Sequence, residues 1–186
     1  MPEWAWILIV VAAIAIAAAI GWFLWSRSRT SALRQRFGPE YDHVLEQRGD
    51  RGDAERELIA RREDRESLRI RPLTADARRD YAERWERTQA TFVDSPALAV
   101  TEADVLVQMV MRDRGYPMDD RDRQMADVSV DHPEVMDRFR SAGRVAGMAR
   151  EGRASTEDLR EAMLHYRELF ERLLAPEEDK PTRRSA

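Results

Sequence analysis

The feature that most limits what this chain can fold into is its opening stretch, 22 residues from Trp4 to Trp25 that carry no charged side chain. At 1.5 Å rise per residue, a helix of that length would measure about 33 Å, which matches the roughly 30 Å hydrocarbon core of a bilayer. Tryptophans stand at both of its ends, as aromatic residues do at membrane interfaces; they are Trp4, Trp6, Trp22 and Trp25. The stretch therefore predicts a single transmembrane helix over 4–25, with the lipid bilayer as its partner.

A cleaved signal peptide is the alternative for this stretch, but it would need a basic start, a short apolar core and a small-residue cleavage site. The chain begins Met-Pro-Glu and the apolar run ends Gly-Trp-Phe-Leu-Trp, so a retained anchor is favoured. Four arginines follow it, and positively charged flanks stay on the cytoplasmic side; they are Arg27, Arg29, Arg34 and Arg36. We expect a single-pass protein of the cell membrane whose N-terminus is outside and whose body is cytoplasmic.

Composition excludes several classes of protein. The chain has no cysteine, so it has no disulfide framework, no cysteine-ligated zinc, no iron–sulfur cluster and no thiol nucleophile. Its 31 basic and 35 acidic residues leave a formal net charge of -4, whereas a general nucleic-acid binder needs a net basic surface. We therefore expect no nucleic-acid partner.

Residues 26–73 read as a basic juxtamembrane segment followed by a charged helical connector. Gly38-Pro39 interrupts the chain, and 40–47 can form a short helix. The tandem Arg-Gly-Asp repeat at 48–53 is expected to be a polar turn. The segment 54–71 is almost wholly charged with a thin apolar stripe, which predicts a solvated or partner-seeking helix that ends at Pro72.

Residues 74–174 carry the signals of a helical bundle. Thr74 can cap a helix that runs to 93, and Pro96 stands at the favoured first turn of the next helix, which Gly115 ends. The segment 119–128 is expected to be a short helix or an ordered loop. Two more caps follow, a capping-box variant at Asp131 with Glu134 three residues later, and the 155–158 Ser-Thr-Glu-Asp segment.

Apolar side chains at helical spacing predict the faces that these helices bury. The last helix has an a/d seam of alternating spacing four and three. The predicted inward residues are Tyr81, Trp85, Thr88 and Phe92; Ala99, Ala103, Leu106, Val107 and Val110, widened by Val105, Met109 and Met111; Val135, Phe139, Ala142, Gly143 and Ala146; and Leu159, Met163, Tyr166, Phe170 and Leu173. The fold expected is all-α, with one N-terminal transmembrane helix, a charged helical connector and an antiparallel bundle of about four helices, followed by a disordered tail at 175–186.

Five segments resemble a family of small bacterial proteins, chiefly actinobacterial. They are RFGPEYD at 36–42, FVDSPALAV at 92–100, MRDRGYP at 111–117, ADVSVDHPEV at 126–135 and STEDLREAMLHYRELFERLL at 155–174. The resemblance covers nearly everything after the predicted anchor. It implies a small membrane-bound or secreted protein and assigns no activity and no functional residue.

Little in the chain points to catalysis. His165 has Glu161 and Glu168 on its helical face, but a bundle metal site uses Glu-x-x-His pairs from two helices, so exposed Glu–His neighbours are the favoured interpretation. His132 stands at a predicted helix start. The nucleophile-elbow, phosphate-loop and dinucleotide motifs are absent from the sequence. We predict no catalytic, cofactor-binding or metal-ligating residue.

Three hypotheses for function remain open at this point. The favoured one is a non-enzymatic interaction or scaffolding module that holds a protein partner at the cytoplasmic membrane face, with a second copy of the chain as a further candidate partner. The second is an envelope-facing or secreted stress-related protein. The third is a metal- or ligand-binding helical protein that uses His132, His165 and Glu161.

Overall fold

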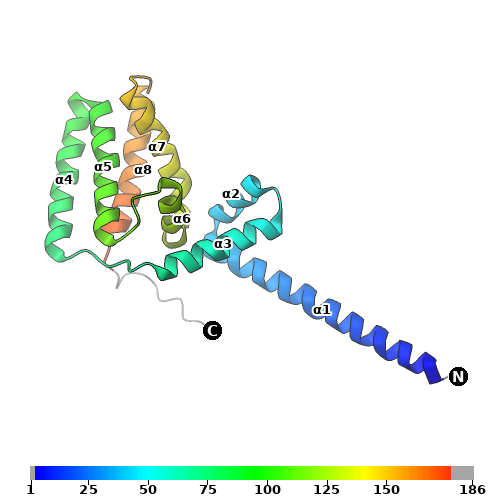
Figure 1. The fold of residues 1–186 in the computed structure, drawn as a ribbon. Helices are drawn as coiled ribbons and strands as arrows, with labels where there is room; N and C mark the ends of the chain where they lie inside the picture. The colour runs from blue at the N-terminus through cyan, green and yellow to red at the C-terminus, as the bar shows by residue number, and fades with distance from the viewer. Residues whose placement is uncertain (1–2, 177–186) are drawn as a thin grey trace. The chain divides into compact units, whose positions relative to one another are not determined.

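A computed structural model describes residues 3–176, apart from the side chains of 3–13, 15, 19, 22 and 24–26 in its first helix. Over that range the chain is helical throughout, with eight α-helices, one short 3₁₀ turn and no strand (Figure 1). The helical bundle predicted from the sequence is confirmed. The predicted tail falls mostly on 177–186, which lie outside the range described.

The structure corrects one element of the expected fold, the predicted transmembrane helix. Helix α1 (Glu3–Phe37) covers 4–25, but no helix among the residues described is long and apolar enough to cross a membrane. A span needs about 20 consecutive apolar residues. The all-helical class holds, and the transmembrane element of it is wrong.

The chain divides into two compact units, residues 1–58 and 59–186. The first contains α1, α2 (Pro39–Arg48) and the start of α3 (Arg51–Ser67). Gly38 separates α1 from α2 at a φ of 48°, where a glycine is favoured. A small apolar cluster holds the three helices together; its buried members are Leu33, Phe37, Tyr41, Val44, Ala54 and Leu58.

Helix α3 differs at both ends from the expectation. It begins at Arg51, inside the tandem repeat, so only Gly49 and Asp50 remain as the turn. It ends at Ser67, several residues before Pro72. The residue before a proline avoids the helical backbone conformation, so a helix must end before Pro72. This does not prevent the helix from ending earlier, as α3 does.

The second unit is a bundle of four helices, α4 (Ala75–Asp94), α5 (Pro96–Arg114), α7 (Met136–Arg150) and α8 (Thr156–Leu174), with α6 (Arg121–Asp131) beside it (Figure 1). Two predicted caps are confirmed. Thr74 Oγ1 accepts the Ala77 N–H at 3.2 Å, and Ser155 with Asp158 forms a complete capping box. These side chains satisfy helix N-terminal amides, and each is typically worth about 1 kcal/mol.

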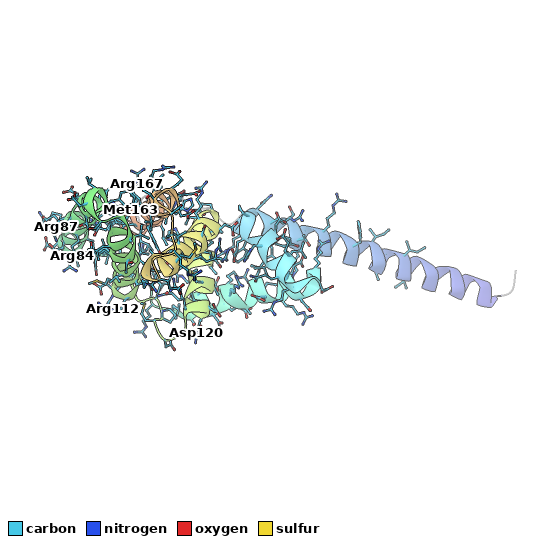
Figure 2. The ribbon with its side chains drawn as sticks, turned by 90° about the horizontal axis from the view of Figure 1, so that it is seen from above. Arg84, Arg87, Arg112, Asp120, Met163 and Arg167 are labelled. Atoms are coloured by element: carbon cyan, nitrogen blue, oxygen red, sulfur yellow. The ribbon has the colours of Figure 1, made fainter. Side chains whose placement is uncertain are left out.

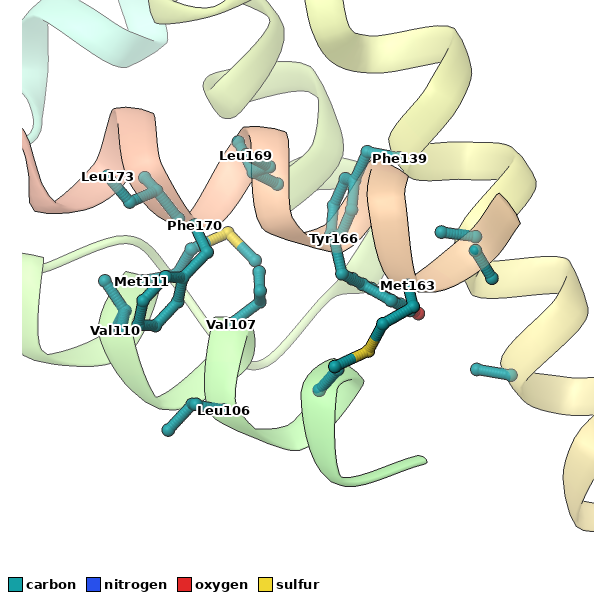
Figure 3. Close-up of a cluster of buried hydrophobic side chains, with 14 of the residues drawn as sticks. Leu106, Val107, Val110, Met111, Phe139, Met163, Tyr166, Leu169, Phe170 and Leu173 are labelled. Atoms are coloured by element: carbon teal, nitrogen blue, oxygen red, sulfur yellow. The ribbon is translucent and has the colours of Figure 1, made fainter. Parts of the chain in front are cut away.

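The bundle core lies between α5, α7 and α8 (Figure 3). The predicted seam of α8 is confirmed, because all five of its residues are buried. Trp85 of α4 stacks on Phe170 of α8, with ring centroids 4.7 Å apart, and Phe139 of α7 meets Tyr166 edge-on at 6.1 Å. Aromatic pairs in such arrangements contribute about 0.5–1.5 kcal/mol beyond the area that they bury.

The segment before α7 departs from the prediction. Asp131 is the last residue of α6 and not a helix cap, and a 3₁₀ turn at Pro133–Val135 precedes α7. The cap in this region is Asp120, whose carboxylate accepts the N–H groups of Asp122 and Arg123 at 2.8 and 3.1 Å. Pro133 has no N–H to donate, so α6 stops at Asp131 and a 3₁₀ turn follows before α7 begins.

Candidate functional site

The clearest candidate site is a groove between α4 and α5. One of its residues, Val105, was predicted to lie in the core. That prediction is wrong, because 53% of the Val105 surface is exposed. Val105 and Met109 line an open groove of about 460 Å³, together with Thr88, Thr91 and the partly covered edge of the core. We call this hollow the α4/α5 groove. Leu98, 52% exposed, stands two helical turns before Val105 on the same face and extends the apolar line.

The two rims of the α4/α5 groove carry opposite charges. Arg84 and Arg87 lie on the α4 rim, where Figure 2 labels both, and Glu102 lies on the α5 rim. Arg84 stands over the Tyr81 ring at 5.7 Å. Neither arginine has an ion-pair partner among the residues that the structure describes. Their charges are therefore available to a bound molecule.

A second group of polar residues lies inside the bundle and centres on Asp104. Its carboxylate is buried and accepts hydrogen bonds from the Tyr166 hydroxyl at 2.8 Å and from Arg150 Nη2 at 3.0 Å, with Arg121 at 3.7 Å. Burial, with Asp104 beside it, raises the pKa of Tyr166, so this phenol stays a donor. All its members are partnered, which makes this a structural network between α5, α6, α7 and α8.

A third polar group joins the end of α3 to α6. Asp131 accepts the hydroxyl of Tyr116 and the Nε of Arg65, both at 2.6 Å. Nearby Asp127 is buried, and its Oδ2 has no hydrogen-bond partner in the described part of the chain. Burial raises the pKa of the Asp127 carboxyl, because the charged form is penalised away from water. Asp131 thus holds the fold together instead of starting a helix.

Arg114 is a buried cation that sequence reasoning missed. Only 1% of it is exposed, and its Nη1 donates to the Leu173 carbonyl at 2.8 Å, near the C-terminus of α8. The last carbonyls of a helix lack internal partners and carry partial negative charge. Arg114 caps α8 and has a structural role. Its position in the last turn of α5, beside the exposed Arg112, gave no signal that separated it from exposed arginines.

The predicted interface and topology residues all lie on α1. The side chains of Trp4, Trp6, Trp22 and Trp25 lie outside those described, so their interfacial role stays a prediction. Of the four flanking arginines, Arg27, Arg34 and Arg36 are exposed on α1 and Arg29 is half-buried. Their use as topology determinants also stays a prediction.

The residues of the metal-binding hypothesis do not come together. His165 Nε2 is 3.8 Å from Glu161 Oε1 on the surface of α8, a pair that a helix makes by itself. His132 is buried at the end of α6, on another element. Within residues 3–176, no group of three or more histidine, aspartate or glutamate side chains could hold a metal ion.

No family model, curated protein or solved structure matches this chain. The resemblance to the actinobacterial family stays a prediction.

Proposed function

We propose that the bundle is a non-enzymatic interaction module, and that the α4/α5 groove binds an amphipathic helix of a partner protein. The observation that carries this proposal is the exposure of Val105 and Leu98 on a helix that buries most of its apolar residues in the core. An unpartnered apolar line beside a hollow is typical of a surface that another protein covers.

The shape of the groove supports a helix as the occupant. On α4 the lining residues Arg84, Arg87, Thr88 and Thr91 follow at helical spacing, so the groove runs along the helix axis. Val105 and Met109 line its other wall. Amphipathic helices bind in such grooves through apolar anchors at spacing three, four and seven. Each anchor of leucine size that is fully buried stabilises a complex by about 1.5–3 kcal/mol.

The charges of the rims set the chemistry of the partner. Arg84 and Arg87 favour glutamate or aspartate on the flank of the helix that faces α4, since guanidinium groups pair well with carboxylates. Glu102 disfavours an acidic residue on the other flank. We infer a partner helix with an apolar stripe and one acidic flank, because charge complementarity selects the partner and its orientation.

Site-specific photo-crosslinking in cells tests this proposal. A photoreactive amino acid replaces Val105 in one version of the full chain and Leu164 in the control, since Leu164 is an exposed apolar residue, 41% exposed, on α8. We expect the Val105 version to capture a segment with an apolar stripe and an acidic flank, and the Leu164 version not to capture it.

Three outcomes would contradict the proposal. The two versions could capture the same segments, the Val105 version could capture a second copy of this chain, or the captured segment could lack acidic residues. Mass spectrometry of the crosslinked peptide distinguishes these results, because it gives the sequence at the point of contact.

A further inference from the structure

A second hollow, independent of the α4/α5 groove, lies in the unit formed by residues 1–58. It has a volume of about 510 Å³ and is bordered by α1, α2 and α3. Five of its lining residues come from α1; besides Gln35 they are Arg27, Thr30, Ser31 and Arg34, which follow at spacing three, one and three. Helical spacing of this kind puts all four on one face. We call this hollow the basic pocket.

Arg51 enters the basic pocket from the start of α3, and a buried carboxylate fixes its position. Its Nε donates to Glu55 Oε1 at 3.1 Å, and the same oxygen accepts the Thr30 hydroxyl at 2.6 Å and the Tyr41 hydroxyl at 3.2 Å. Arg51 also donates to Thr30 Oγ1. Burial alone would raise the pKa of Glu55, but these hydrogen bonds outweigh it and lower the pKa. Glu55 is therefore ionised and holds Arg51 at the pocket.

The lining of the basic pocket has three arginines and no acidic residue. Glu55, outside the lining, balances one of them. Arg34 lies over the Tyr41 ring at 5.0 Å and, among the residues that the structure describes, its ion-pair partner is the exposed carboxylate of Asp42, at 3.5 Å. Arg27 makes no ion pair with any residue described in this structure. The pocket thus has an excess of positive charge, and the Ser31 hydroxyl lies in the same lining.

We propose that the basic pocket binds the phosphate group of a phosphate monoester. Guanidinium groups pair with phosphate through two parallel hydrogen bonds, and Ser31 adds a hydroxyl that can donate to a third oxygen. Arg27 and Arg34 are two helical turns apart, about 10 Å along the axis, so their long side chains can close on one anion between them. Tyr41 and Leu45 provide an apolar surface for the organic part of the ester.

The phosphate could belong to a soluble ester or to a lipid headgroup, and both sources share this chemistry. Calorimetric titration of the full chain in nonionic detergent with glycerol phosphate tests the first source. Flotation with phosphatidylcholine vesicles, with and without phosphatidic acid, tests the second. Each titration is run on the natural chain, on Arg27→Gln with Arg34→Gln, and on Arg36→Gln. Arg36 is the matched control because it is exposed on α1 but does not line the pocket.

We expect the natural chain to bind at least one of the two phosphate sources. The double variant should weaken that binding by about tenfold or more, since charge-assisted bonds to phosphate are among the strong ones. Arg36→Gln should leave it within about twofold, as a surface charge away from the site would. Binding of glycerol phosphate assigns a soluble ester, and binding of phosphatidic acid vesicles alone assigns a headgroup.

Two results would overturn the proposal. The first is that neither source binds the natural chain at about 10 mM phosphate, an affinity too weak for a built site. The second is an equal loss in Arg36→Gln and in the double variant, which would show general charge attraction. Arg34→Lys is a second variant in case the double variant misfolds. It keeps the positive charge but loses the planar guanidinium donors, so its affinity for phosphate should be intermediate. Circular dichroism of every variant checks that the helices remain.

Discussion

The strength of the buried network around Asp104 leads to a quantitative prediction for Tyr166→Phe. Tyr166 is fully buried and its hydroxyl donates to Asp104 at 2.8 Å. Phenylalanine keeps the ring and its packing against Phe139 and removes only this bond. A hydrogen bond to a charged group contributes about 1.5–3 kcal/mol. Asp104 keeps Arg150 at 3.0 Å, so the carboxylate is not left unpaired, and we expect a loss of about 2 kcal/mol.

Tyr81→Phe is the matched control for that change. The Tyr81 hydroxyl donates to Asp113 at 2.6 Å, but this carboxylate is 44% exposed, so water can replace the phenol. We expect a loss of about 0.5 kcal/mol there. Urea unfolding of the full chain, followed by circular dichroism, gives the loss of unfolding free energy for both variants. The comparison holds if the slope of that free energy against urea concentration is unchanged. Equal losses in the two variants would refute the argument that burial of the acceptor makes the Asp104 network strong.

Two further predictions concern glycines and a buried acid. Gly115→Ala should destabilise the bundle by more than about 1 kcal/mol, because its φ is 98° and an added Cβ would stand 2.9 Å from the backbone oxygen of Arg69. Gly147→Ala, inside α7 with open space around it, should stabilise by about 0.5–1 kcal/mol, and thermal unfolding in which both changes have the same sign would contradict this. Asp127→Asn should stabilise the bundle at pH 7. Burial raises the pKa of Asp127 in the folded protein above its ordinary value of 3.8. This carboxyl therefore contributes stability that is fully present below pH 3.8, where Asp127 is protonated, and that is lost as the pH rises through the folded-state pKa. Urea midpoints should therefore fall with pH less steeply in Asp127→Asn, and identical pH profiles would count against it.

Local signals predicted the bundle well. Thr74 and Ser155 were recognised as caps because a cap depends on the side chain and on residues within one turn. The seam of α8 was recognised because a helix repeats its inward face at fixed spacing. These features involve neighbours in sequence, and the structure confirms them.

The features that sequence reasoning missed depend on residues far apart in the chain. Val105 was placed in the core because it widens an apolar stripe, but whether a flank of that stripe is covered depends on where α4 lies. Asp131 was interpreted as a cap, yet its partners are Tyr116 and Arg65, which are distant in sequence. The transmembrane prediction used the apolar run at 4–25 and the tryptophans and arginines that flank it, and the structure does not support it. The α4/α5 groove could be found only from the packed helices.

The measurement that tests the central claim most directly is a charge reversal in the α4/α5 groove. Two labelled synthetic helices share one apolar stripe and carry either glutamate or lysine on the flank that faces α4. Fluorescence anisotropy is measured with the natural chain and with Arg84→Glu plus Arg87→Glu. We predict that the natural chain binds the glutamate helix at least about tenfold more tightly, and that the double variant prefers the lysine helix. A preference that does not reverse, or no binding of either helix, would contradict the account.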